Sequence, residues 1–169
     1  MATDDGVWDD WVRTYFERVY RRAYRLTGNR QDAEDLAQDV FVRVFRYVSA
    51  PTPALLHVIT TNLFIDRARA KRRIRWDRLA DNDQLPASGE APPPQIVEDR
   101  ILASDVVAAL QGLCPEYRAV VVLRDIEGLT YREIASTLGL KIGTVQSRIH
   151  RGRAGLRHAL PHRAPRQAA

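Results

Sequence analysis

Apolar residues recur in pairs every four positions through the first part of the chain. This spacing keeps them on one face of an α-helix, in which 3.6 residues make a turn. The pairs are Val7 with Trp8, Trp11 with Val12, Tyr15 with Phe16, Val19 with Tyr20, and Ala23 with Tyr24. Gly28 and Asn29 follow, and such residues commonly end a helix. The pattern therefore predicts an amphipathic helix over residues 7–26.

Two more helices are predicted after short connections. One apolar face runs from Gln31 to Val48, and acidic residues in its first turn suit the positive end of the helix dipole. Pro51 and Pro53 end this helix and begin a third, which we expect to run to about Arg75. Three helices with short connections predict a small bundle.

The composition changes between Asp81 and Pro94, where four prolines occur and large apolar residues are almost absent. This composition is typical of an extended linker. Helical periodicity resumes from Ile96 to about Leu110, and Pro115 stands where the first residue of a further helix belongs. No segment alternates apolar and polar residues over the length of a strand. The chain is therefore predicted to be all-α, with two small helical domains joined by a flexible linker.

The segment 129–157 predicts a helix-turn-helix in the second domain. Gly128 suits the end of the preceding helix, Thr130 and Glu133 fit a capping box, and Gly139 permits a sharp turn. The apolar residues of the two predicted helices keep to one side of each: Ile134, Ala135, Leu138, Leu140, Val145, Ile149 and Leu156. Such a pair sets its second helix in the major groove of DNA. An ordinary helical hairpin is the alternative.

Charge is distributed unevenly, although the net charge is only +5. Residues 1–40 hold nine acids against six bases, whereas residues 66–78 hold seven bases and two acids. After residue 129 the only acid is Glu133. Two separated basic blocks on an otherwise acidic chain indicate two contacts with a polyanion. For either block taken alone, a solvated helix face is the alternative.

Polar and basic residues occupy the remaining faces of the second helix of the predicted helix-turn-helix. They are Thr144, Gln146, Ser147, Arg148, Arg151 and Arg153. Arginine suits guanine edges because its planar fork donates two hydrogen bonds, and it also neutralises phosphate. Gln146 and Ser147 either read bases or face water. Acids are absent from this helix because a carboxylate there would be repelled by DNA phosphates.

The third predicted helix carries a narrow polar stripe, since its members are four, three and four residues apart. The stripe consists of Asn62, Asp66, Arg69 and Arg73. It is either a helix edge held by Asp–Arg pairs or a track for nucleic acid. In the second interpretation phosphates contact Arg69, Lys71, Arg72, Arg73 and Arg75. Trp76 either stacks on a base or packs at a boundary.

Little in the sequence points to catalysis or to a bound metal. The histidines are scattered at positions 57, 150, 158 and 162, and no Gly-rich phosphate loop occurs. A lone Cys114 excludes an internal disulfide and a multi-thiolate zinc site, and we expect it to be a small buried residue.

No apolar stretch is long enough to cross a bilayer, and the acidic start MATDDGVWDD is unlike a signal peptide. We expect a cytoplasmic protein that is no enzyme, holds no cofactor or metal and does not insert into a membrane.

Three motifs, taken in order, resemble bacterial RNA polymerase sigma factors of the extracytoplasmic-function (ECF) group. They are DAEDLAQDVFVRVFR (32–46), LLHVITTNLFIDRARAKRR (55–73) and LTYREIASTLGLKIGTVQSRIHRGRAGLR (129–157). The resemblance runs from about Tyr15 to Leu160. The sequence departs from the family pattern at Leu55, where tryptophan is usual, at Thr60, where alanine is usual, and at Lys141, where proline or serine is common.

The resemblance implies a domain organisation of four parts. They are sigma region 2 at 1–78, a linker at 79–95, sigma region 4 with the helix-turn-helix at 96–161, and a C-terminal tail at 162–169. It further implies binding to core RNA polymerase, promoter recognition, DNA opening and transcription initiation at a specific regulon. Control by an anti-sigma factor is also implied. The alternatives are a free-standing helix-turn-helix transcriptional regulator and an enzyme acting on nucleic acid.

The resemblance also implies roles for individual residues. The helix of the first motif would dock on the clamp coiled coil of the largest polymerase subunit through Asp32, Asp35, Leu36, Gln38, Asp39 and Phe41. The three acids of this set share a helix face that suits a basic partner, although complementation of the helix dipole is an alternative. The minus-ten element would contact Asn62, Asp66, Arg69, Lys71, Arg72 and Arg73. The minus-thirty-five element would contact Lys141, Thr144, Gln146, Ser147, Arg148, Arg151 and Arg153.

Overall fold

The computed structural model of the protein describes residues 4–47, 52–80 and 103–163, and these ranges hold helices but no strand. The N-terminal half consists of three helices: α1 (Asp4–Thr27), α2 (Arg30–Tyr47) and α3 (Pro53–Ala80). The C-terminal half consists of α4 (Ser104–Gln111), α5 (Pro115–Val121), the π-helical turn η1 (Val122–Ile126), α6 (Tyr131–Leu138), α7 (Ile142–Ala159) and the 3-10 turn η2 (Pro161–Arg163). The predicted all-α fold is confirmed. None of the described helices has the length and apolar character needed to cross a membrane.

The observed helix bounds lie within a few residues of most of the predicted ones. The largest difference is at the start of α4: a helix was predicted from Ile96, but Ala103 is a non-helical N-cap and α4 begins at Ser104. The end of α3 was predicted near Arg75 and lies at Ala80. No glycine or proline interrupts residues 75–80, so nothing in their backbone chemistry ends the helix earlier. Residues 81–94 of the predicted linker lie outside the described residues, whereas residues 79 and 80, which the resemblance placed in the linker, form the end of α3.

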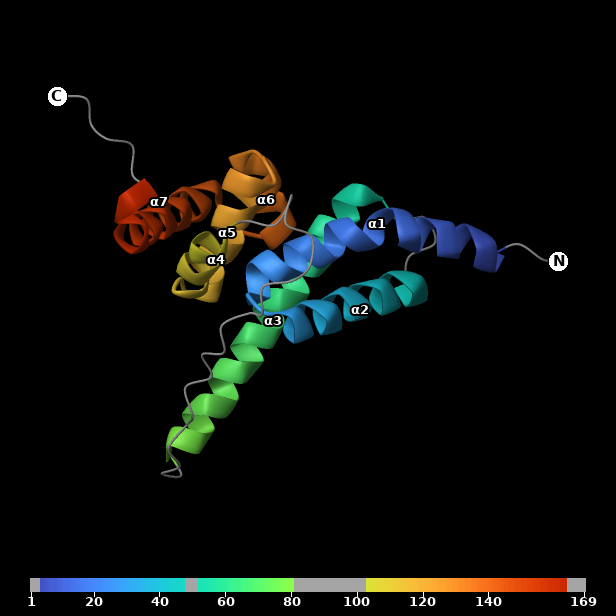
Figure 1. The fold of residues 1–169 in the computed structure, drawn as a ribbon, viewed down its shortest axis with the longest axis horizontal. Coiled ribbons are helices and arrows are strands. Elements are labelled where there is room, and N and C mark those ends of the chain that lie inside the picture. Colours follow the sequence, from blue (N-terminus) through green and yellow to red (C-terminus); the bar gives the residue numbers. More distant parts are fainter. Residues whose placement is uncertain (1–3, 48–51, 81–102, 164–169) are drawn as a thin grey trace.

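The connection between α1 and α2 follows from two residues. Gly28 has a φ of +79°, a conformation that glycine adopts without steric cost, and it ends α1 as predicted. Asn29 then caps α2, because its Oδ1 accepts from the backbone N–H of Asp32 at 2.8 Å. Its Nδ2 also donates to the Asp32 carboxylate at 3.0 Å. The two helices consequently lie side by side and antiparallel, with α3 crossing them (Figure 1).

The predicted helix-turn-helix is present, with its start and its turn formed as expected. The Thr130 hydroxyl accepts from the backbone N–H of Glu133 at 3.3 Å, and the Glu133 carboxylate accepts from the backbone N–H of Thr130 at 2.7 Å. This reciprocal arrangement is the predicted capping box. Gly139 turns the chain after α6 with a φ of +61°. Upstream, Pro115 occupies the first turn of α5, and Gly128 has a φ of +77° just after η1.

Each half has its own hydrophobic cluster. In the N-terminal half the fully or nearly fully buried members are Val19, Ala37, Val40, Val44 and Leu56. In the C-terminal half they are Val120, Leu123, Ile134, Ala135, Val145 and Ile149. The second cluster fixes α6 and α7 against the end of α5. Of the apolar face predicted for the helix-turn-helix, Ile134, Ala135, Val145 and Ile149 are buried, and Leu138, Leu140 and Leu156 are half-buried.

A third hydrophobic cluster joins the two halves. It contains Ala23, Leu26, Ala33, Leu36, Phe64 and Ile65 from α1–α3, and Leu110, Leu113, Ala119, Val121 and Val122 from the C-terminal half. Burial of apolar area is the main stabilising term in folding, so this cluster holds the halves together. The sequence predicted two domains but contained no sign of a shared cluster. In α3, Leu56, Phe64 and Ile65 are buried, while the later part of the helix extends away from the other helices (Figure 1).

Candidate nucleic-acid and polymerase interfaces

The first turns of α7 present most of the residues predicted to contact the minus-thirty-five element. Gln146 and Ser147 are exposed, and Lys141 is exposed at the N-cap position of the helix. Thr144 and Arg148 are half-buried at its side. Because Val145 and Ile149 are buried on the opposite side, the helix holds these polar side chains in a fixed direction. This is the surface that a helix-turn-helix presents to a major groove.

The two later arginines of α7 are held by other parts of the C-terminal half. The Arg153 guanidinium forms a bidentate pair with Asp125 of η1, with Nε 3.0 Å from Oδ2. Arg151 donates to the Tyr117 hydroxyl at 3.1 Å. Arg151 remains exposed and free to reach a phosphate, whereas Arg153 has to exchange an internal carboxylate for one.

The polar stripe of α3 is exposed at its later end and covered at its beginning. Asp66, Arg69 and Arg73 are exposed. Among the described residues no salt bridge joins Asp66 to either arginine, so the Asp–Arg edge considered as an alternative is not formed. Asn62 is half-buried, and its Nδ2 lies 3.4 Å from the carbonyl oxygen of Thr137 in α6. The side chains of residues 74–80, Trp76 included, lie outside the described part.

The two basic blocks, which are far apart in sequence, meet in space. Arg72 of α3 lines the same cavity as Thr144, Ser147 and Arg148 of α7. Its guanidinium is 3.3 Å from the Glu116 carboxylate at the start of α5. Residues assigned to the minus-ten element and to the minus-thirty-five element therefore lie beside one another in this arrangement.

The acidic face of α2 is on the surface, but basic residues of α3 partly neutralise it. Asp35 and Asp39 are exposed, and Arg67 of α3 pairs with the Asp39 carboxylate and donates to the Asp35 carbonyl oxygen at 3.2 Å. Asp32 is half-buried, with Lys71 3.4 Å away. The hydrogen bond from the Asn29 side chain and then the Lys71 charge lower the pKa of Asp32, although burial opposes them.

One residue assigned to this surface does not reach it. Leu36 is fully buried in the cluster that joins the two halves, so its side chain is structural. Gln38 is exposed as expected, and Phe41 is half-buried. An apolar residue in the middle of an amphipathic helix is more often part of the core than of a contact surface, and that explanation applies to Leu36.

Exposed apolar side chains adjoin the acidic face. Phe45 belongs to the apolar face predicted between Gln31 and Val48, yet 62% of it is exposed. Phe16 of α1 and Val42 of α2 are each 44% exposed. Phe16 stacks on Phe41 with ring centroids 6.0 Å apart, and Trp8 meets Phe45 edge-on at 5.4 Å. We call Asp35, Gln38, Asp39, Phe41 and Phe45 together the α2 surface.

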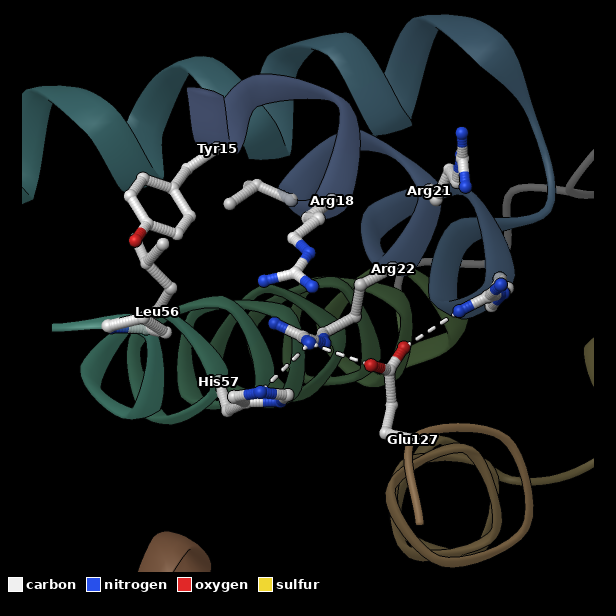
Figure 2. A pocket seen from close by; sticks show the side chains of 10 residues that line it. Tyr15, Arg18, Arg21, Arg22, Leu56, His57 and Glu127 are labelled. Atoms are coloured by element: carbon white, nitrogen blue, oxygen red, sulfur yellow. Dashed lines mark hydrogen bonds and ion pairs between the residues drawn. The ribbon is translucent and has the colours of Figure 1, made fainter. Parts of the chain in front are cut away.

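Polar contacts that the sequence does not reveal join the two halves. Glu127 follows η1, and its carboxylate accepts from Arg22 and Arg25 of α1, each at 2.8 Å (Figure 2). Arg22 also lies 3.3 Å from Nε2 of His57. Burial raises the pKa of Glu127, but the Arg22 and Arg25 charges outweigh burial and hold it below its usual value. More than a hundred residues separate these partners, so no local pattern could have paired them.

Arg118 is a second buried link between the halves. Its guanidinium donates to the carbonyl oxygens of Gln111 at 2.9 Å and of Leu113 at 3.0 Å, and it also donates to the carbonyl oxygen of Leu26 in α1. It lies 5.6 Å from the centroid of the Phe64 ring in α3. Burial lowers its pKa to about 10, so the side chain still carries its charge at neutral pH.

The remaining sequence expectations concern the cysteine and metal binding. Cys114 is exposed rather than buried, because its position as the N-cap of α5 places it at a turn on the surface. Within the described ranges, no group of three or more histidine, cysteine, aspartate or glutamate residues is arranged to hold a metal ion. The carboxylates of Asp32, Glu34 and Asp39 in α2 pair with lysine or arginine.

Two family models match the chain, in the same order as the motifs. The model described as Sigma-70 region 2 matches residues 11–74, and that described as Sigma-70, region 4 matches residues 104–156. The first covers α1 to the later part of α3, and the second covers α4 to most of α7.

Two solved structures share the fold. One is the sigma factor RpoE in complex with the anti-sigma factor NepR from Bartonella quintana, with a TM-score of 0.68 and 23% identity, covering 90% of this chain and 96% of that one. The other is CnrH in complex with the cytosolic domain of CnrY, with a TM-score of 0.60 and 24% identity, covering 95% of this chain and 92% of that one. At this identity they establish the fold only.

Similar sequences extend the match over nearly the whole chain. ECF RNA polymerase sigma factor SigE of Mycolicibacterium smegmatis is 55% identical over 158 residues, which is 90% of this chain and 61% of the length of that relative. ECF RNA polymerase sigma factor SigW of Bacillus subtilis is 35% identical over 172 residues, or 93% of this chain and 90% of SigW. The RNA polymerase sigma-E factor of Streptomyces coelicolor is 33% identical over 158 residues, covering 90% and 85%. The chain therefore belongs to the ECF group of RNA polymerase sigma factors.

Proposed function

We propose that this chain is a promoter-specificity subunit that binds core RNA polymerase in the cytoplasm and directs initiation without catalysis of its own. The observation that carries the proposal is that one sigma-family chain presents two exposed basic helices, α3 and α7, and a separate acidic surface on α2. We assign residues 1–78 to region 2, 79–95 to the linker, 96–161 to region 4 and 162–169 to the tail. The start of this tail has an internal contact, since Arg163 Nε lies 2.7 Å from the Asp105 carboxylate.

The first turns of α7 are proposed to read the minus-thirty-five element. Ser147, Gln146 and Arg148 are suited to base edges, because hydroxyl, amide and guanidinium groups match the donors and acceptors of the major groove. Lys141 and Arg151 are suited to the flanking phosphates. Such contacts make binding dependent on salt.

The exposed part of α3 is proposed to hold the opened minus-ten element. Arg69, Arg73 and Lys71 are exposed and suited to the backbone of a single strand. Asn62 is assigned to a base, and for that role its contact with Thr137 has to break. DNA contact at this end of α3 therefore requires α6 to move away.

The α2 surface is proposed to bind core RNA polymerase. Asp35 and Asp39 supply negative charge, and Phe41 and Phe45 supply apolar area next to it. A charged rim beside exposed aromatic side chains is common at specific protein interfaces. A basic partner would take the place of Arg67 on Asp39.

Promoter binding is proposed to need separation of the two halves. The two promoter elements differ in position by about 25 base pairs, or about 85 Å of B-DNA at about 3.4 Å per base pair. Arg72 and Arg148, which are assigned to different elements, line one cavity in the described arrangement. They cannot reach both elements at once. We propose that an anti-sigma factor controls this step; the RpoE structure with the same fold is a complex with the anti-sigma factor NepR.

The test separates DNA recognition from polymerase binding with matched variants. Arg148→Ala should lower promoter-specific transcription by purified core polymerase about 5- to 100-fold, because one base contact contributes about 1–3 kcal/mol. Its binding to polymerase should be unchanged. Asp39→Lys should weaken polymerase binding about tenfold through charge reversal. Arg157→Ala and Glu34→Lys are the controls, since both residues are exposed on the same helices but outside the assigned sets.

The two assays have distinct outcomes. Equal losses of polymerase binding and promoter recognition in both test variants would contradict the assignment of separate surfaces. Specific binding of the chain to a DNA site without polymerase, combined with no polymerase binding, would indicate the free-standing regulator instead.

A further inference from the structure

A basic cavity of about 280 Å³ lies where α1, α3 and the end of η1 meet. Its basic lining residues are Arg18, Arg21, Arg22 and Arg25 of α1 and His57 of α3. Among the described lining residues, Glu127 is the one acid. Figure 2 shows Arg18 and Arg22 extending from α1 toward His57, with Glu127 on the other side of Arg22.

The guanidiniums outnumber the carboxylates that neutralise them. Glu127 accepts from Arg22 and Arg25 together, and Arg21 pairs with Glu17 one turn away on α1. Arg18 has no salt bridge within the described part of the chain. Positive charge that is gathered in a partly enclosed space attracts anions more strongly than charge on an open surface.

Two hydrogen-bond donors at this cavity are buried without an acceptor. Arg22 is 4% exposed, and its Nε–H has no partner. An arginine can only donate, so its contact with His57 makes Nε2 the acceptor. Burial and then the Arg22 charge lower the pKa of His57, so the ring is neutral at pH 7 and carries its proton on Nδ1. This Nδ1 is also buried and unpaired. A buried donor without an acceptor is unfavourable, so an acceptor that reached either group would be stabilised.

We propose that this cavity binds a phosphate-bearing anion, either inorganic phosphate or the phosphoryl end of a larger molecule. A phosphoryl group carries several acceptor oxygens and about two negative charges, which matches an excess of guanidiniums with unfilled donors. The volume suits a small oxyanion, since sites for drug-sized ligands begin at about 300 Å³. The inference is independent of the proposed sigma function, because it rests on residues outside the DNA-binding and polymerase-binding sets.

The charge of Glu127 should affect the affinity of the proposed site for an anion. Its carboxylate occupies one side of Arg22 and Arg25, so it competes with an incoming anion for the same guanidiniums. Removing its charge should therefore strengthen anion binding. A merely structural role of these arginines would give no change in anion affinity. Residues from both halves of the molecule line the site. Anion binding and the ion pairs of Glu127 with Arg22 and Arg25 therefore affect each other.

The test is a calorimetric titration of the 169-residue chain with inorganic phosphate at constant ionic strength. Arg18→Gln should weaken binding at least about fivefold, because a lining charge is lost without loss of a described contact. Arg13→Gln is the matched control, since Arg13 is exposed on the same helix and does not line the cavity. Glu127→Gln should tighten binding several-fold.

Titrations with ATP and pyrophosphate identify the source of the phosphoryl group. Tighter binding of ATP or pyrophosphate than of phosphate would assign the site to the phosphoryl end of a larger molecule, and tighter binding of phosphate would assign it to the free anion. No saturable phosphate binding below about 10 mM would overturn the proposal. Equal phosphate affinity in the wild type, Arg18→Gln and Glu127→Gln would overturn it as well. Circular dichroism of each variant checks that the helices are intact.

Discussion

At Glu127 a carboxylate with 14% of its side chain exposed is held between the guanidiniums of Arg22 and Arg25. A buried acid is tolerated only when its charge is paired and hydrogen-bonded, and both oxygens of Glu127 satisfy that condition. The pKa of Glu127 is lower in the folded protein than its ordinary value of 4.5. Its ionisation therefore stabilises the fold above that pH, and this contribution is lost as the pH falls through the folded-state pKa.

At the residue scale we predict that Glu127→Gln lowers the free energy of unfolding by about 1–3 kcal/mol at pH 7. The difference from the wild type should shrink as the pH falls below about 4.5, because the wild-type carboxyl then becomes protonated and resembles the amide. Urea denaturation of both proteins between pH 7 and pH 3 measures this difference in the free energy of unfolding. A difference that stayed constant over this range would mean that the charge of Glu127 is not what stabilises the contact.

At the scale of elements, the position of the recognition helix α7 depends on one close approach. A Cβ added at Gly152 would lie 2.5 Å from Cγ2 of Val121 and 3.5 Å from Cβ of Tyr117 in α5. Only glycine lets α7 approach α5 this closely. Gly143, near the start of the same helix, has no atom within 4 Å of such a Cβ.

The two glycines make a matched pair for an element-scale prediction. Gly152→Ala should destabilise the protein by about 1–3 kcal/mol through overpacking. Gly143→Ala should stabilise it by about 0.5–1 kcal/mol, because alanine favours the helix and meets no neighbour. Thermal denaturation of both variants provides the comparison. Stabilisation by Gly152→Ala would show that α7 is not packed against α5 in this way.

At the scale of the whole molecule, the two sigma-family halves are held together by an apolar cluster, by Arg118 and by the ion pairs of Glu127. The apolar cluster opposes separation because its members would be exposed to water. The ion pairs of Glu127 lie at the edge of this contact. They favour the closed arrangement, in which the two halves touch, over an open one in which they are apart. Reversing the sign at Glu127 places three positive charges together and should shift the balance toward the open arrangement.

We predict that Glu127→Lys increases the radius of gyration by several ångströms over the wild type, measured by small-angle X-ray scattering. Glu34→Lys is the control, because Glu34 pairs only with Arg30 on the same helix, within the described contacts, and its reversal leaves the radius unchanged. Helical content should stay at the wild-type value in both variants. A compact Glu127→Lys protein with intact helices would show that the ion pairs do not govern the closed arrangement.

The sequence by itself determined the helices, their caps and the helix-turn-helix. These features depend on neighbours three or four positions apart, as with Thr130 and Glu133, or on one backbone conformation, as at Gly139. The basic blocks and the family motifs are likewise contiguous. For that reason the candidate residues of α3 and α7 follow from the sequence alone, and most of them are on the surface.

Only the tertiary structure decided which residues face a neighbour and which face water. A periodic pattern gives a helix face but does not say how far the packing extends around it, so Leu36 and Phe45 share the apolar face of α2 and yet Leu36 is buried and Phe45 exposed. Cys114, which was expected to be buried, is exposed at the start of α5. The pairing of Arg22 with Glu127 joins positions 105 apart, and the basic cavity exists only where α1, α3 and η1 meet. Contacts of this kind depend on the packing of whole helices, which no local pattern in the chain specifies.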